Sequence, residues 1–178
     1  MRRTIILLAL FAAACCTAMS QPRQMNYSVQ LVPVAPCGAD LSVRHVTDDA
    51  AMGGHNTIEY AFKNNSSSPC TLDGYPRFEL LDKSGRVRRG GRAVKTERLP
   101  GEETKRPPQL VTLDPGKEAW FSVYYNNGGA GYVGKPCPFS RKVRITAPGA
   151  VRRFVLRESI RSCRAVEVSS VRGSEPLQ

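Results

Sequence analysis

The amino-acid sequence predicts an all-β fold, a sandwich of seven to nine antiparallel strands in one domain. Apolar and polar residues alternate with a period of two, which is typical of strands with one buried and one solvated face. Turn residues separate these stretches at short intervals. No segment keeps a helical period, and 13 prolines and 15 glycines in 178 residues disfavour a helical bundle.

The alternation is clear in seven segments, each of which predicts one strand. These segments are residues 41–43, 58–62, 78–80, 121–125, 143–145, 154–156 and 166–168. An eighth strand is expected at 109–113, and the composition of 27–32 is compatible with a further short one.

Turn chemistry separates the expected strands. Residues 114–116 and 147–149 each contain Pro followed by Gly, where Pro presets φ and Gly accepts a positive φ. A Gly pair at 53–54, a polar run at 64–69 and an Asn-Asn-Gly-Gly run at 126–129 end other strands. Turn residues therefore mark where several of the expected strands begin and end.

The N-terminus has the pattern of a secretion signal at residues 1–20. Arg2 and Arg3 precede a ten-residue apolar stretch at 5–14, which is too short to span a bilayer. We expect an exported protein, periplasmic or extracellular, with a tether at 21–36, a domain at 37–172 and a tail at 173–178. Removal of residues 1–20 takes two Arg and no acid, which lowers the formal net charge from +11 to +9.

Two processing routes are compatible with this signal. Ala18 and Ser20 supply small residues for an ordinary signal peptidase, so that the mature chain begins at Gln21. Alternatively, Cys15 or Cys16 becomes the lipidated first residue of a lipoprotein, and only then is the protein a peripheral membrane protein. The first route is slightly favoured, and both remain open.

Four cysteines follow the signal: Cys37, Cys70, Cys137 and Cys163. An even number in an exported chain predicts two disulfides, whereas a metal site would need closely spaced pairs. If 41–46 pairs with 57–63, and 142–146 with 151–157, each hairpin brings its flanking cysteines to one end. Strand direction therefore favours Cys37–Cys70 with Cys137–Cys163, and Cys37–Cys163 with Cys70–Cys137 is the alternative.

Several motifs together resemble a known bacterial family. They are the run NNSSSPCTLDGYP at 64–76, Cys37 with Leu41, Leu113 with Pro115-Gly116, Cys137-Pro138 and the last Cys163. Over residues 37–172 they are similar to the domain-of-unknown-function family numbered forty-two thirty-two, which comprises exported proteins and lipoproteins. The resemblance implies an immunoglobulin-like sandwich and no particular activity.

A basic segment at 83–106 holds nine Lys or Arg and three Glu. Arg86, Arg88, Arg89 and Arg92 surround Gly90-Gly91 and define a predicted basic arm, which we expect as an exposed loop or an edge hairpin after the strand at 78–81. Charges on an edge strand prevent pairing with other sheets. The functional interpretation is an arm that attracts anionic cell-surface polymers or lipid headgroups.

The two histidines are the remaining group with metal-binding chemistry. His45 and His55, with Asp48 and Asp49, bracket an expected turn at 47–54, where imidazole and carboxylate together would suit a divalent metal. Solvated turn residues are the favoured interpretation, so we expect no metal and no cofactor.

Two further groups of residues have the composition of a binding site. The Gly-x4-Gly-Lys run at 129–135 lacks the Ser or Thr of a phosphate-binding loop. Tyr124, Tyr125, Tyr132 and Trp120 either stack on sugar rings or belong to the core.

No nucleophile motif accompanies either histidine, so we expect no catalytic residue. We expect a non-catalytic secreted or envelope-associated binding module with a basic arm, without specific nucleic-acid binding. An enzyme of hydrolase type with an unrecognised site, and a purely structural envelope accessory protein, are the alternatives. The sequence leaves the oligomeric state open.

Overall fold

The computed structural model describes residues 33–98, 105–128 and 133–173. The signal, both lipidation cysteines and the expected strand at 27–32 lie outside this part of the chain. The elements are β1 (Leu41–Ala51), η1 (Met52–Gly54), β2 (His55–Asn64), β3 (Cys70–Asp73), β4 (Arg77–Leu81), β5 (Val87–Arg92), β6 (Val94–Lys95), β7 (Leu110–Leu113), β8 (Glu118–Asn126), β9 (Phe139–Ser140), β10 (Lys142–Thr146), β11 (Arg153–Leu156), β12 (Ile160–Arg161) and β13 (Glu167–Val168). In the described ranges no helix is long and apolar enough to cross a membrane.

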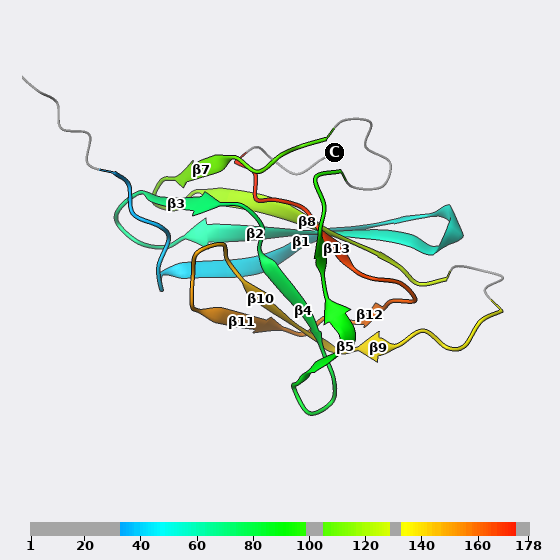
Figure 1. The fold of residues 1–178 in the computed structure, drawn as a ribbon. Helices are drawn as coiled ribbons and strands as arrows, with labels where there is room; N and C mark the ends of the chain where they lie inside the picture. Colours follow the sequence, from blue (N-terminus) through cyan, green and yellow to red (C-terminus); the bar gives the residue numbers. More distant parts are fainter. Residues whose placement is uncertain (1–32, 99–104, 129–132, 174–178) are drawn as a thin grey trace, which may run out of the picture. The chain divides into compact units, whose positions relative to one another are not determined.

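Two main sheets form the sandwich (Figure 1). The five-stranded sheet has the order β1-β2-β8-β13-β6, and the four-stranded sheet has the order β11-β10-β4-β5. The small sheets β12-β9 and β3-β7 complete the domain. The all-β sandwich expected from the sequence is therefore confirmed, and each of the eight expected strands from residue 41 onward is present.

The core lies between the two sheets and is built from the alternating apolar residues. Tyr60, Phe62 and Phe121 from the five-stranded sheet are fully buried, with ring centroids 5.0 Å apart for Phe62 and Phe121 and 5.4 Å apart for Tyr60 and Phe121. Phe78 and Ile145 face them from the four-stranded sheet. Burial of such side chains contributes roughly 1.5–3 kcal/mol each, which makes this layer the main source of stability.

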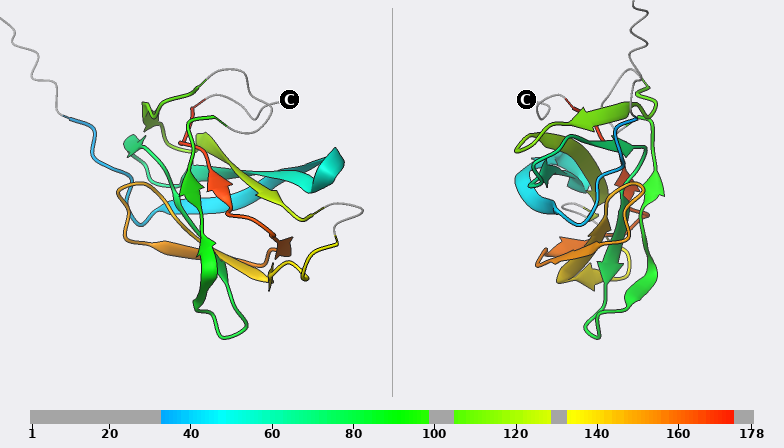
Figure 2. Two further views of the ribbon diagram at one scale, coloured as in Figure 1. Left: turned by 45° about the vertical axis from the view of Figure 1, so that its right-hand side comes forward. Right: turned by 90° about the vertical axis from the view of Figure 1, so that its left-hand side faces the viewer.

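One continuous segment passes from the first sheet to the second. β5 is the edge of the four-stranded sheet, and β6, two residues later, pairs parallel with β13 in the five-stranded sheet. Between them, the Ala93 amide donates to the Phe78 carbonyl at 2.9 Å and the Val94 amide donates to the Val166 carbonyl at 2.7 Å. Figure 2 shows this segment running along the side of the sandwich, where it joins the two sheet edges.

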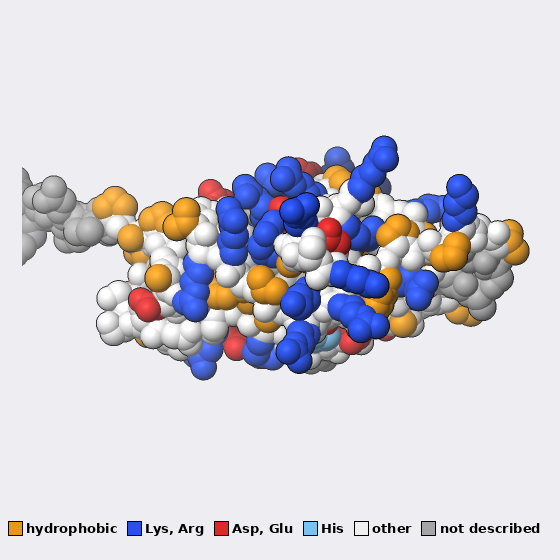
Figure 3. Space-filling view, turned by 90° about the horizontal axis from the view of Figure 1, so that it is seen from below, with side chains coloured by type: hydrophobic (Ala, Val, Ile, Leu, Met, Phe, Trp, Pro, Cys, Tyr) orange, Lys and Arg blue, Asp and Glu red, His pale blue; other side chains and the backbone are white. Residues whose placement is uncertain are grey.

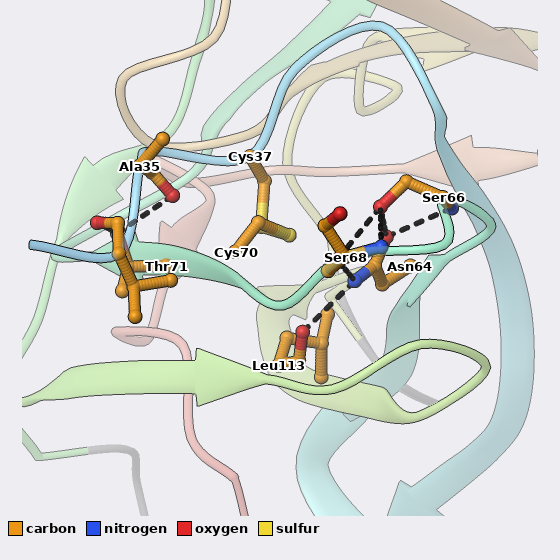
Figure 4. The surroundings of a disulfide bond; sticks show 9 residues. Ala35, Cys37, Asn64, Ser66, Ser68, Cys70, Thr71 and Leu113 are labelled. Carbon is orange, nitrogen blue, oxygen red and sulfur yellow. Dashed lines mark hydrogen bonds between the residues drawn. A yellow bond between two sulfur atoms is a disulfide. The ribbon is translucent and has the colours of Figure 1, made fainter. Parts of the chain in front are cut away.

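The disulfides are Cys37–Cys70 and Cys137–Cys163, so the local pairing is confirmed and the alternative pairing is wrong. The β1–β2 ladder starts at Leu41 opposite Asn64, which brings the chain before β1 beside the chain after β2. The Asn64 amide fixes this end by donating to the Ser68 and Leu113 carbonyls, both at 2.9 Å (Figure 4). These hydrogen bonds hold the loop that leads from β2 to Cys70 against β7.

The C-terminal segment continues along β8 in the five-stranded sheet. The Trp120 and Arg172 backbones exchange two hydrogen bonds of 2.8 Å. The Arg172 guanidinium pairs with Glu59, which is 5% exposed, and donates to the Ser122 hydroxyl at 2.9 Å; that hydroxyl in turn donates to Glu59. The buried charge of Glu59 is therefore neutralised by Arg172, which the C-terminal segment places beside it.

The first hairpin is longer than the alternation indicates. β1 and β2 pair as far as Ala51 opposite His55, and only residues 52–54 form the turn. Asp48, Asp49 and Ala50 belong to β1 although they show no apolar alternation, and all three are exposed. A sequence pattern based on burial could not detect this end of the hairpin, because burial is what produces the pattern.

A basic face on the four-stranded sheet as candidate functional site

The predicted basic arm forms the β4–β5 hairpin at the edge of the four-stranded sheet, one of its two expected forms. Asp82 organises the turn, because its carboxylate accepts hydrogen bonds from the Ser84 amide at 2.8 Å, the Ser84 hydroxyl at 2.7 Å and the Arg86 amide at 2.9 Å. These bonds, the Ser84 hydroxyl first, hold the pKa of Asp82 below its ordinary value. The turn is thus held by a charged acceptor.

The Gly90-Gly91 pair sets how the arm crosses its neighbour. Gly90 has a φ of +67°, and a Cβ on Gly91 would lie 2.7 Å from the Leu80 carbonyl oxygen. The register of β4 with β5 shifts here, between Glu79 and Leu81. Only glycine permits this close approach, and it lies where the ladder between the two strands is irregular.

The four arginines of the arm differ in their surroundings. Arg86 and Arg89 are exposed, while Arg88 is half-buried and its Nε is buried without a hydrogen-bond partner in the described part of the chain. Burial lowers the pKa of Arg88. Among the described residues, Arg92 is the one arginine of the arm whose side chain pairs with an acid, its Nε lying 3.4 Å from Glu79. The arm therefore contributes Arg92, whose guanidinium is oriented by Glu79, to the outer face of the sheet.

The sheet register gathers further arginines around Arg92. Glu79 lies opposite Arg92 on β5 and opposite Arg144 on β10. Two residues along, Thr146 lies opposite both Arg77 and Arg153. We define the basic face as Arg77, Arg92, Arg144 and Arg153 around Glu79. Figure 3 shows Lys and Arg side chains gathered on this side of the molecule.

Glu79 holds two guanidinium groups by their Nε atoms. Its side chain is 5% exposed, and it accepts from Arg144 at 2.7 Å while Arg92 lies at 3.4 Å. A guanidinium has five N–H donors, so the terminal nitrogens of both arginines stay available. The Arg92 side chain is 78% exposed, which directs its free donors toward solvent. Four arginines and one carboxylate give this cluster a formal charge of +3.

A groove of about 680 Å³ adjoins the face. Its lining residues include Tyr75 and four cationic residues, and within the described chain they include no Asp or Glu; the cationic residues are Arg77, Arg92, Lys95 and Arg153. The loop at 147–151 supplies an apolar side, in which Val151 is 96% exposed. The arrangement can bind an anionic group that also carries an apolar surface.

The structure brings His45 and Asp48 together, but it places His55 far from them. His45 lies opposite Tyr60, and His55 lies opposite Ala51, which is six positions after His45 on β1 and therefore about 20 Å away. The expected 47–54 turn is therefore wrong. In the ranges described, no group of three His, Cys, Asp or Glu side chains is arranged to hold a metal ion.

Each histidine has its own partners. His45 lies between two carboxylates, with Nε2 3.0 Å from Asp48 and Nδ1 3.0 Å from Glu158. The Nδ1 of His55 contacts the Tyr124 hydroxyl. Glu158 comes from the connection between β11 and β12, 113 residues from His45, so the sequence carried no signal for this contact.

The aromatic residues do not form one exposed platform. Tyr124 and Tyr125 are neighbours on β8 and point to opposite faces of the sheet. Tyr124 is 9% exposed and Tyr125 is half-buried. Tyr132 and the centre of the Gly-rich loop lie outside the described residues.

The fold and this face define an all-β, disulfide-bonded sandwich domain with one strongly cationic sheet surface. The family model described as Domain of unknown function (DUF4232) matches residues 37–173, and the chain belongs to this family. No curated protein matches it.

Among solved structures, the crystal structure of Se-Met labeled Beta-glucosidase from Kluyveromyces marxianus is similar with 11% identity and a TM-score of 0.30. The match covers 68% of this chain and 14% of that one, and this similarity is too low to indicate a shared fold or activity.

Proposed function

We propose that the chain is an exported, non-catalytic binding module whose basic face binds anionic polymers of the cell surface. The observation that carries the proposal is the arrangement around Glu79, where a buried carboxylate orients two guanidinium groups beside a groove with further cations. Charge-assisted hydrogen bonds from guanidinium groups suit phosphate, sulfate and carboxylate. Electrostatic attraction by such a face accelerates association with polyanions.

The surroundings of the histidines support a role without catalysis. Both ring nitrogens of His45 face carboxylates, and His55 contacts a tyrosine. A nucleophilic mechanism needs a base hydrogen-bonded to a Ser, Thr or Cys nucleophile. In the described part of the chain, no hydrogen bond joins either histidine to such a side chain.

The two disulfides support export, since disulfides persist in oxidising compartments. The secretion signal at 1–20 supplies the route. Replacing both Cys15 and Cys16 with Ala distinguishes the two processing routes. If Gln21 is the mature start, the double variant keeps the location and mass of the wild-type protein; a membrane-bound wild type with a soluble double variant would establish lipidation.

Binding is tested with the triple variant Arg77→Gln, Arg92→Gln and Arg153→Gln on immobilised heparin. We expect elution at clearly lower salt, with a shallower dependence of affinity on salt because fewer counterions are released. The melting temperature should stay close to that of the wild type, since exposed charges contribute little stability.

The matched control removes three exposed cations elsewhere, with Lys63→Gln, Lys117→Gln and Arg164→Gln. It has the same net charge as the triple variant and should elute close to the wild type. Equal elution of the two triple variants would show that net charge alone governs retention and would overturn the proposal. A third variant, Arg86→Gln with Arg89→Gln, measures what the exposed part of the arm adds.

A further inference from the structure

A second hollow of about 500 Å³ adjoins the groove of the basic face. Tyr75 and Lys95 line both hollows, and the Lys95 Nζ lies 5.4 Å from the centre of the Tyr75 ring. The second hollow adds Arg98 and Lys105 as cations and Glu97 as an acid. The Tyr75–Lys95 pair is therefore the common wall of two consecutive cationic depressions.

The two depressions lie along the segment that passes between the two main sheets. Arg92 is on β5 in the four-stranded sheet, while Lys95 is on β6 in the five-stranded sheet. The cations thus follow the segment that passes from one sheet to the other, and they do so around the edge of the sandwich.

Resting on the function proposed above, we propose that these depressions form one continuous track for a linear polyanion. We define the track as Arg153, Arg77, Arg92, Lys95, Arg98 and Lys105. The ligand is a chain of repeated anionic units long enough to pass the Tyr75–Lys95 pair. A single phosphate, sulfate or lipid headgroup fills only one depression.

The apolar parts of the walls favour an anionic polysaccharide over inorganic polyphosphate. Half-buried Tyr75 and Ala150 and exposed Val151 lie among the cations of the first depression. The carbon–hydrogen faces of sugar rings can pack against such groups, while their acidic substituents pair with guanidinium. Inorganic polyphosphate offers only the charges.

A chain-length series tests the track. Heparin disaccharide, octasaccharide and dodecasaccharide are titrated against the wild type and against the double variant Arg98→Gln with Lys105→Gln. We expect the affinity lost by the double variant to grow with chain length, because only a long chain reaches Arg98 and Lys105 while it also occupies the basic face. For the dodecasaccharide the double variant should lose affinity, and the slope of log affinity against log salt should fall by about two, one for each lost contact.

The control is Lys63→Gln with Lys117→Gln, which removes the same charge outside the track and should bind every length like the wild type. Equal loss in both double variants, or a slope that does not depend on length, would overturn the track and leave the basic face intact as an anion site. Failure of every length to bind the wild type would instead overturn the proposed function. Polyphosphate binding as tight as that of heparin of equal charge would overturn the polysaccharide assignment.

Discussion

The carboxylate of Glu79 on β4 accepts a hydrogen bond of 2.7 Å from the Nε of Arg144 on the neighbouring strand β10. The same carboxylate faces the Nε of Arg92 on the other side, so one buried acid connects three adjacent strands. Glu79 therefore has two opposed effects on anion binding. It subtracts one positive charge from the face, and it fixes the orientation of two guanidinium groups.

The variant Glu79→Gln separates these two effects. We expect heparin affinity to fall although the net positive charge rises by one, because the amide cannot orient both arginines. Stability should fall by about 2 kcal/mol, the range for a hydrogen bond to a charged group. Denaturant unfolding and heparin elution measure the two quantities.

Glu118→Gln is the matched control, since Glu118 accepts two hydrogen bonds from Arg44 on the other sheet, at 3.0 and 2.7 Å. The Arg44 side chain is 53% exposed, so this pair contributes up to about 1 kcal/mol. The control should bind heparin at least as well as the wild type. Tighter binding by Glu79→Gln would show that its charge outweighs its positioning role.

Each disulfide should contribute measurably to stability. Cys37–Cys70 spans 33 residues and Cys137–Cys163 spans 26, and the chain-entropy model assigns about 3.5–4 kcal/mol to loops of this size. Replacing either pair with Ser should lower the free energy of unfolding by that order. Urea titration of the two pair variants checks this, and an unchanged midpoint would contradict it.

Breaking the buried pair of Glu59 and Arg172 should free the C-terminal segment. Arg172→Ala leaves the Glu59 carboxylate buried with only the Ser122 hydroxyl, and losing one member of a buried ion pair costs about 3–5 kcal/mol. The backbone amide of Trp120, which donates to the Arg172 carbonyl, should then exchange faster with solvent.

Adding Glu59→Gln to Arg172→Ala should recover part of that loss, because the uncompensated charge is removed. Additive effects of the two substitutions would show that the pair is not coupled. Hydrogen exchange and unfolding experiments on the single and double variants provide the measurement.

Tyr60 should make stability fall at alkaline pH. Burial, with the charges of Glu158 and Asp48, raises the pKa of its phenol above the ordinary value near 10. Because the pKa of this phenol is higher in the folded than in the unfolded state, its contribution to the free energy of unfolding is complete below about pH 10. Above that pH the free energy of unfolding falls by about 1.4 kcal/mol per pH unit.

Tyr60→Phe should remove this part of the alkaline slope. Near neutral pH it should leave stability unchanged or raise it by about 1 kcal/mol, because the Tyr60 hydroxyl is buried without a partner in the described chain. Unfolding free energies from pH 7 to 11 test both statements, and a large loss at pH 7 would reveal a hydrogen bond for this hydroxyl.

The register of the four-stranded sheet assembles the basic face from distant parts of the sequence. Arg92 was identified because basic residues are dense around it, but Arg77, Arg144 and Arg153 each stand in ordinary strand patterns. Arg144 and Glu79 are 65 residues apart, and no local signal connects them. The contact between His45 and Glu158 could not be predicted for the same reason, since these residues are 113 positions apart.

The sequence by itself determined the all-β class, the strands with an apolar face, the four cysteines of two disulfides and the family resemblance. Burial leaves a period-two pattern along the chain, and turns and cysteines are marked by residue type, so these features are local. Only the tertiary structure decided which arginines share a face, how far the β1–β2 hairpin extends and which partners the histidines have. These features depend on which strands lie side by side, and the pairing of distant strands follows from the packing of the whole core.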